Sequence, residues 1–432
     1  MRKRLAAVVG ISMVLLLSGC ANKDSVNLEK GVSAPVDTVT EQEESGLSDV
    51  EHIASLYRDI YENARQSTTL GDLEVTRNFV RRLGEYGYAV VDENNQIDMA
   101  NPQQVVDFYD MTAKKETAEL TLIMVTDSGG FIQYDFLSKD GVVEVERGYY
   151  QYVDGKLENI NRAAYIAQDW QYTQEGYLVF EGGFYSDSYH ALVASDATEH
   201  VAVRVEPLPD RCRELNRDYL LPAGYGKNNL FLADWDETDY GTLNFYDVFD
   251  KFYPDVYQRL VPYVADGNVN AETVYQIPAD TFERVIGRYF KIETGVLRQK
   301  TIYNPEGETY EYRPRGLYES DYADVPYPEV VDYQDNSDGT ITLTVNAVYP
   351  EENTSRAFTH ETVVRLLEDG SFQYVSNQVV YPEDNYDAWW HAGRMDQKQW
   401  EETYSSAAHI DENCGSGEYS SVYTDEDGSL LS

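Results

Sequence analysis

The densest group of ligand-type side chains is the acidic run Asp234-Trp235-Asp236-Glu237-Thr238-Asp239. Calcium prefers oxygen ligands, and a calcium-binding loop supplies them at fixed positions, with glycine at the sixth and a carboxylate at the twelfth. Counted from Asp236, these two positions hold Gly241 and Asp247. The third and fifth positions, where carboxylates are needed, hold Thr238 and Tyr240. Asp236 and Asp247 are therefore candidate ligands of an incomplete Ca²⁺ loop, the alternative is a solvated acidic loop, and no other cofactor is predicted.

Familiar catalytic patterns are missing from the chain. The six histidines show no His-Glu-x-x-His spacing, and no Gly-x-Ser-x-Gly elbow or phosphate-binding loop is present. A glycosidase needs two carboxylates about 5–10 Å apart across a cleft. The 76 acidic residues offer many such pairs and no means of choosing among them. The sequence therefore favours a protein without catalytic activity.

Aromatic residues are the remaining candidates for a binding surface. The chain has 37 Tyr, 14 Phe and 5 Trp, and most of these fit sheet packing, because tyrosine is a favoured strand residue. Trp389 and Trp390 differ, since two adjacent tryptophans in a polar stretch cannot both face one core. We predict an aromatic binding surface at this pair, suited to a sugar ring or a peptide anchor.

The first 20 residues carry the pattern of an export signal. Arg2, Lys3 and Arg4 precede an apolar segment of about 13 residues at positions 5–17, which fits a secretory signal and is too short to span a bilayer. The ending Leu17-Ser18-Gly19-Cys20 resembles the lipobox of bacterial lipoprotein precursors. That resemblance implies cleavage before Cys20, acylation of its thiol, and localisation at the outer face of the cell membrane.

Charge narrows the choice of partners. Removal of residues 1–19 leaves 31 Lys and Arg against 76 Asp and Glu, a formal charge of −45. Such a surface repels nucleic acid and anionic lipid headgroups. We therefore expect no nucleic-acid partner and membrane attachment through acyl chains alone, where two chains give the stable anchoring that one does not. A cell-wall, glycan or protein partner stays open.

Two cysteines remain once Cys20 is acylated, Cys212 and Cys414. Export permits oxidation, so the two could pair and close a loop of about 200 residues, which would stabilise the fold by about 5 kcal/mol on the chain-entropy model. The alternative is that both thiols stay reduced. Their number and spacing fit neither a disulfide framework nor a zinc site.

The elements that position these residues follow from hydrophobic periodicity. Helices are predicted from residue 48, over about 72–83, and from Pro102, followed by short strands from about 118 to 205 with hairpin turns at Asp140-Gly141 and Asp154-Gly155. The same order recurs, with helices near 245–253 and 280–290 and strands near 341–345, 362–367 and 372–381. This grouping predicts an α+β fold with helices packed on mainly antiparallel sheets in two lobes.

The predicted organisation has six parts. It comprises a signal peptide at 1–19, an acylated tether at 20–47, an α+β domain at 48–210, a connector at 211–240, a second α+β domain at 241–388 and a polar, partly disordered tail at 389–432. At about 410 mature residues, the chain is long enough for two domains with separate cores.

Three segments carry a wider resemblance. They are residues 282–290 (FERVIGRYF), 338–343 (DGTITL) and 370–374 (GSFQY). Through them, residues 49–385 resemble acidic, tyrosine-rich lipoproteins of Gram-positive anaerobic bacteria that form a family of unknown function. The resemblance implies no activity and no site residues. We therefore predict a non-catalytic surface lipoprotein that binds a ligand or partner. The alternatives are an extracytoplasmic hydrolase acting on glycan or peptide and, third, the solute-binding lipoprotein of a transporter.

Overall fold

The computed structural model describes residues 43–183, 198–263, 274–316, 319–322, 324–381 and 388–402. The chain divides into a short unit, Met1–Val50, and a compact unit, Glu51–Ser432. The four sheets formed by the described residues all belong to the compact unit. None of the helices in the described ranges is long and apolar enough to cross a membrane.

The first sheet is a five-stranded meander with one parallel pair at its edge. Its order is β1-β2-β3-β4-β5, in which β1 pairs parallel to β2 and the other pairs are antiparallel. The strands are β1 (Ala89–Asp92), β2 (Ala118–Val125), β3 (Phe131–Lys139), β4 (Val142–Val153) and β5 (Lys156–Ile166). Asp140-Gly141 and Asp154-Gly155 have positive φ at both residues, as a two-residue hairpin turn requires. Both predicted turns are confirmed.

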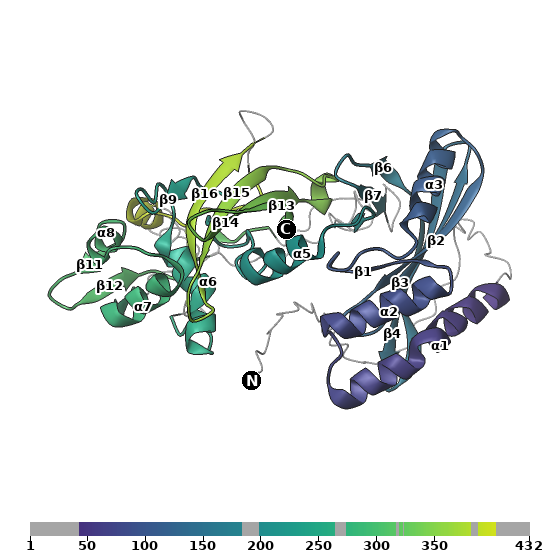
Figure 1. Cartoon of the computed structure of the whole chain (residues 1–432), viewed down its shortest axis with the longest axis horizontal. Coiled ribbons are helices and arrows are strands. Elements are labelled where there is room, and N and C mark those ends of the chain that lie inside the picture. The colour runs from purple at the N-terminus through teal and green to yellow at the C-terminus, as the bar shows by residue number, and fades with distance from the viewer. Residues whose placement is uncertain are drawn as a thin grey trace, which may run out of the picture. The chain divides into compact units, whose positions relative to one another are not determined.

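Three helices accompany this sheet, drawn in purple and blue in Figure 1. They are α1 (Glu43–Ser67), α2 (Leu73–Glu85) and α3 (Pro102–Ala113). Tyr57 of α1 packs edge-on against Phe79 of α2 at 4.9 Å between ring centroids and contacts Phe131 of β3 at 6.4 Å. Phe108 of α3 contacts the ring of Phe136 at 5.9 Å. Because Phe131 and Phe136 differ by an odd number of residues, their side chains lie on opposite faces of β3. The helices therefore pack on both faces of the sheet.

A second, three-stranded antiparallel sheet completes the N-terminal core. Its strands, in the order β6-β7-β8, are β6 (Gln168–Tyr172), β7 (Tyr177–Gly183) and β8 (Thr198–Arg204). Leu178 and Phe180 of β7 share a hydrophobic cluster with Phe108 and Phe136. The face of the first sheet that carries Phe136 is thus covered by α3 and the second sheet.

The C-terminal part is built on a five-stranded antiparallel sheet, ordered β13-β14-β15-β16-β9, and a three-stranded one, ordered β10-β12-β11. Its helices are α5 (Asp210–Leu215), η1 (Asn216–Leu220), α6 (Phe245–Tyr257), α7 (Ala279–Tyr289), α8 (Thr294–Gln299) and η3 (Pro350–Glu352). Its strands are β9 (Trp235–Asp236), β10 (Tyr275–Pro278), β11 (Tyr303–Asn304), β12 (Thr309–Tyr312), β13 (Tyr327–Asp335), β14 (Thr340–Val348), β15 (Thr359–Leu366) and β16 (Phe372–Val380). The fold is α+β with mainly antiparallel sheets, as predicted.

Two predicted segments are corrected by their burial. Residues 211–240 are not a connector, because Leu220, Phe231 and Trp235 belong to the C-terminal hydrophobic core. The predicted tail begins too early, because Trp390 is fully buried in the same core. Residues 210–220 form α5 and η1, in which the buried Cys212, Leu215 and Tyr219 have helical spacing that sequence reasoning overlooked. The buried residues Phe231 and Trp390 lie in turns and carry no periodic signal. The tether prediction, 20–47, also extends too far, since α1 begins at Glu43.

Two polar side chains near helix N-termini bond to other elements. Asn101 precedes α3 with a left-handed backbone, φ +55°, and its side-chain amide donates to the carbonyls of Gly84 and Tyr88. Glu283 of α7 accepts from Arg298 at 3.0 Å. These two side chains therefore join separate elements.

A buried charged contact joins the N-terminal strands to β13. Glu329 accepts from Tyr177 Oη at 2.6 Å and from Arg204 Nη1 at 2.6 Å. The side chains of Arg204 and Glu329 are 6% and 7% exposed. Burial raises the pKa of Glu329, while Arg204 and Tyr177 oppose that rise. The two cores are therefore connected within one compact unit by a fully paired charge.

Candidate functional site

An open hollow of about 1120 Å³ lies over the first sheet. Its walls come from α3 and β2 to β5, which Figure 1 shows on the blue N-terminal part of the chain. The 18 residues that line it are Gln104, Asp107, Phe108, Met111, Thr117, Ala118, Glu119, Leu120, Thr121, Asp135, Phe136, Leu137, Glu144, Val145, Glu146, Ala164, Tyr165 and Ile166. Five of these are carboxylic acids, and none is Lys, Arg or His.

Strand register explains why these side chains gather. One row of cross-strand neighbours is Glu119, Leu137, Glu144 and Ile166. The next row on the same face is Thr121, Asp135, Glu146 and Ala164. All eight residues of the two rows line the hollow. These eight side chains lie on the face opposite α3, whereas a third row in the lining, Leu120, Phe136, Val145 and Tyr165, lies on the face that α3 covers. The lining residues therefore come from both faces of β2, β3, β4 and β5.

Hydrogen bonds hold part of this face in place. Asp135 accepts from Thr121 Oγ1 at 2.6 Å and from Gln133 Nε2 at 2.7 Å. Glu146 makes an exposed ion pair with Arg162 at 3.1 Å. Sequence reasoning missed these carboxylates among the 76 acidic residues of the chain. The signal that could have found some of them is the Asp140-Gly141 turn, which fixes the pairing of Lys139 with Val142 and hence of Asp135 with Glu146.

The two candidate calcium ligands lie in different surroundings. The carboxylate of Asp236 accepts from the backbone nitrogen and hydroxyl of Thr238, both at 2.6 Å. These bonds lower the pKa of Asp236. Asp247 is buried and is bound by two arginines, so its oxygens are not directed toward the acidic loop. Both candidate ligands are therefore already hydrogen-bonded within the protein, Asp236 to Thr238 and Asp247 to the two arginines. In the described part of the chain, no group of three or more His, Cys, Asp or Glu side chains is arranged to hold a metal ion.

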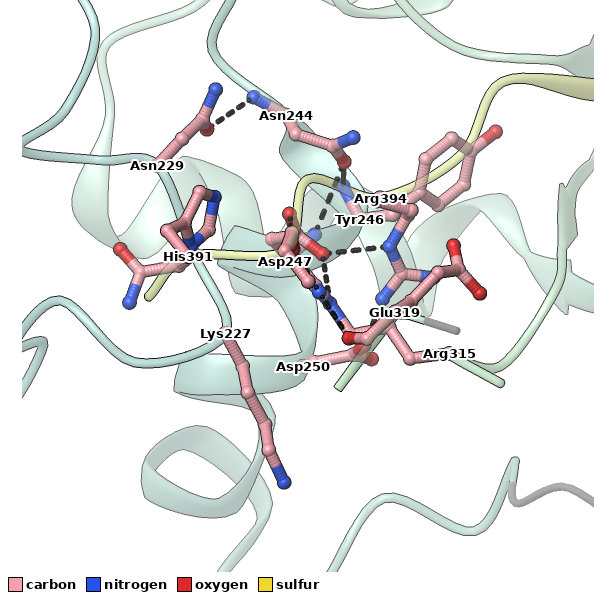
Figure 2. Close-up of polar contacts among 12 residues, drawn as sticks. Lys227, Asn229, Asn244, Tyr246, Asp247, Asp250, Arg315, Glu319, His391 and Arg394 are labelled. Atoms are coloured by element: carbon pink, nitrogen blue, oxygen red, sulfur yellow. Dashed lines mark hydrogen bonds and ion pairs between the residues drawn. The ribbon is translucent and has the colours of Figure 1, made fainter. Parts of the chain in front are cut away.

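Asp247 is the centre of a buried ionic network, shown in Figure 2. Arg394 Nε donates to its Oδ1 at 2.7 Å, and Arg315 donates to Oδ1 at 3.0 Å and to Oδ2 at 2.8 Å. Arg394 also pairs with Asp250. Burial acts to lower the pKa of Arg394, but Asp250 and Asp247 outweigh it and raise that pKa. The network fastens the segment around Arg394 to α6, which is a structural role.

The two predicted aromatic residues separate in the structure. Trp390 is 0% exposed and packs edge-on against Tyr225 and Tyr349, so its assignment to a binding surface is wrong. Trp389 is 46% exposed, and its Nε1 donates to Glu352 Oε1 at 2.6 Å. The exposed partner of Trp389 is Tyr322, whose ring centroid lies 4.8 Å away. Because Tyr322 and Trp389 are far apart in the sequence, residue spacing could not predict this pair.

Comparison with known proteins assigns a family and no activity. A protein-family model described as a family of unknown function (DUF6070) matches residues 43–394. The chain belongs to this family. Neither the curated proteins nor the solved structures contain a match.

The cysteine predictions fall mostly outside the described residues. Cys20 and Cys414 both lie outside the described residues, so the pairing of Cys414 with Cys212 stays a prediction. Cys212 is 1% exposed, and burial raises the pKa of its thiol.

Proposed function

We propose that this chain is a lipoprotein that acyl chains on Cys20 hold at the outer face of the cell membrane, where it binds a ligand without transforming it. The anchor rests on the charged and apolar residues of positions 2–17 and on the Leu17-Ser18-Gly19-Cys20 ending. The binding role rests on the hollow of about 1120 Å³, which is large enough for a small ligand, since such sites measure about 300–1,000 Å³.

The character of the hollow favours binding over hydrolysis. A hydrolase that uses paired carboxyl groups keeps one of them in an apolar pocket, where it holds a proton for the leaving group. Glu119, Glu144 and Glu146 are all exposed. Exposed carboxylates can attract and orient a ligand, but water solvates them too well for that acid role.

The topology gives less support to a transporter's solute-binding protein. That class alternates strands with helices and binds its solute between two lobes. Here β2 to β5 follow one another as hairpins, and the hollow lies on this single sheet. A binding module with its site on one sheet is the function that this geometry supports best.

A thermal-shift screen with a blocked variant tests the binding role. The mature chain, residues 20–432 without acylation, is screened against small cationic, neutral and anionic compounds. A ligand at a hundredfold excess over its Kd stabilises the native state by about 2.7 kcal/mol. We expect a stabilising compound for the wild type, for which Ala164→Trp, an exposed position in the hollow, removes the effect.

The matched control is Asn159→Trp, which adds the same bulk at an exposed position of β5 outside the hollow. This variant should keep the stabilisation. Equal loss in both tryptophan variants would refute the assignment of the site, and turnover of a glycan or peptide by the wild type would refute the non-catalytic role.

The anchor is tested separately. Wild-type protein should incorporate an alkyne-labelled palmitate analogue and partition into the detergent phase, because two buried acyl chains give stable membrane attachment. Cys20→Ala should carry no label and leave the membrane fraction or stay uncleaved. A labelled Cys20→Ala protein would show that the anchor lies elsewhere.

A further inference from the structure

The fifth strand of the first sheet is an open edge. Among the described residues, β5 pairs only with β4, and its 11 residues make it about twice as long as a typical strand. An edge strand presents a row of unpaired backbone N–H and C=O groups, which proteins commonly interrupt with a proline, a charge or a bulge. β5 contains no proline, and its bulge lies at Ile160, where the register with β4 shifts. Residues 161–166 therefore form a regular edge.

One hydrogen bond fixes which backbone groups of this edge are free. Ala167 N donates to Val143 O at 2.9 Å, so these two residues are a hydrogen-bonded pair of the antiparallel β4–β5 ladder. Such pairs alternate along a ladder, so the N–H and C=O groups of Arg162, Ala164 and Ile166 point away from β4. All three residues are exposed, and no residue that the structure describes forms a hydrogen bond to these backbone groups. The edge thus presents three donors and three acceptors in a row.

The side chains beside this edge are suited to a partner of a particular pattern. Arg162, Ala164 and Ile166 are two residues apart, so their side chains share one face of the sheet. Ile166 is 57% exposed and offers an apolar contact. Ala164 is small and its neighbour on β4, Glu146, is exposed, so a long basic side chain can cross Ala164 to reach this carboxylate, over two strand spacings or ~10 Å. Arg162 contacts the same carboxylate at 3.1 Å, but with side chains 63% and 65% exposed the pair is weak, which leaves Arg162 available to an acidic partner.

We propose that an extended peptide segment of a partner protein adds to the first sheet as an antiparallel strand along Arg162–Ile166. Its backbone pairs with the free groups of β5, which supplies affinity, and its alternate side chains supply specificity. The register places an apolar residue opposite Ile166, a basic residue opposite Ala164 and an acidic residue opposite Arg162. This inference rests on the proposed function, because Ala164, Ile166 and Glu146 also line the hollow and the peptide is the class of ligand that is named for it.

A second copy of the chain suits this edge less well. In a symmetric antiparallel pair centred on Ala164, Ile166 lies opposite Arg162 twice, which provides neither an apolar contact nor a charge pair. A pair centred on Arg162 places two like charges opposite each other, which destabilises a sheet. A pair centred on Ile166 uses little of the edge, because β5 ends at that residue. The pattern of the edge therefore favours a different protein as the partner.

N-methylated peptides test strand addition on the wild-type protein. The probe is the blocked peptide acetyl-Thr-Val-Thr-Lys-Thr-Glu-Thr-amide, whose Val, Lys and Glu fall opposite Ile166, Ala164 and Arg162. It is titrated by calorimetry into the unacylated mature chain. N-methyl groups on Val, Lys and Glu remove the donors that face β5 and should weaken binding at least tenfold, or ~1.4 kcal/mol. N-methyl groups on the Thr residues that follow them face away from β5 and should weaken binding less than about threefold. Equal weakening by the two modifications would overturn the pairing.

Substitutions test the protein side of the contact. Proline is tolerated on an edge strand where its missing N–H faces solvent, so Ala164→Pro should keep its circular dichroism spectrum and bind the peptide at least tenfold more weakly. Glu146→Lys should reverse the charge preference, so that it binds the peptide with Glu in place of Lys more tightly than the original peptide. The matched control is Glu361→Lys, at an exposed position of β15, which should keep the wild-type preference. Equal effects of the two lysine variants would mean non-specific charge attraction and would overturn the register.

Two further results decide between occupants. A dimer of the mature chain in sedimentation that Ala164→Pro dissociates would overturn the peptide assignment in favour of a second copy. Absence of binding of the unmethylated peptide to the folded wild type would overturn the inference. A compound from the thermal-shift screen whose effect Ala164→Trp removes would then leave the proposed function standing.

Discussion

Asp247→Asn should destabilise the C-terminal core severely. The substitution keeps the shape of the side chain and removes the charge that faces Arg315 and Arg394. The side chains of Asp247, Arg315 and Arg394 are 2%, 11% and 6% exposed, so water screens the change little. Breaking one partner out of such a buried pair costs about 3–5 kcal/mol, because the remaining charge is buried without compensation.

That loss is large against the total stability of a folded domain, which is about 5–15 kcal/mol. Urea unfolding followed by tryptophan fluorescence measures it, since Trp390 is buried in the same core. With an m-value of ~3 kcal/mol/M, the midpoint should fall by about 1–2 M. Asp335→Asn makes the same chemical change at an exposed position of β13 and should stay within about 0.5 kcal/mol of wild type.

A second substitution checks the mechanism. In Asp247→Asn/Arg394→Gln, the guanidinium that lost one of its two acidic partners is also removed, so the double variant should be less destabilised than the sum of the two single variants. A loss below about 1 kcal/mol for Asp247→Asn, or strict additivity in the cycle, would refute the account of the network.

Three further predictions concern pH, metal and thiols. Burial lowers the pKa of His360 to about 3, with the Asn377 hydrogen bond opposing the shift. The unfolded state therefore binds a proton that the folded state does not, and the contribution of neutral His360 to stability is full above about pH 6.5 and falls by about 1.4 kcal/mol per pH unit below it. Urea unfolding of the wild type and of His360→Gln at pH 6.5 and 4.5 measures how the free energy of unfolding depends on pH. This dependence should correspond to one proton fewer in His360→Gln, and equal dependence in the two proteins would contradict the prediction. Chelation of calcium at fixed ionic strength should lower the melting temperature by no more than a few degrees, since the Asp236 loop lacks ligands and Asp247 is occupied by arginines; a larger fall would reveal a native-state calcium site. If Cys212 and Cys414 pair, unfolded, non-reduced protein acylated at Cys20 should contain no titratable thiol, and two titratable thiols would exclude the bond.

Local sequence patterns predicted most of the helices and strands. The helix over 73–85 and the strands joined at Asp140-Gly141 follow from periods of 3.6 and 2 residues, which depend only on near neighbours. The same reasoning assigned residues 211–240 to a connector, because beyond the short helices α5 and η1 their buried residues, such as Phe231, lie in turns without a period. Burial in irregular segments depends on the rest of the core and cannot be found locally.

The candidate sites depend on contacts between distant segments. Arg394 reaches Asp247 across 147 residues, so neither spacing nor composition pointed to the pair. The part of each row that lies on β3 and β4 could be predicted from the sequence, because the two-residue turn sets the register of these strands. The register of β2 with β3, which adds Glu119 and Thr121, follows a longer connection and had to come from the structure.

A crystal structure of the mature chain with a compound that stabilises it in the thermal-shift screen tests the central claim most directly. The account predicts the compound against β2 to β5, in contact with Ala164. An empty hollow with the compound bound at another surface of the chain would contradict it.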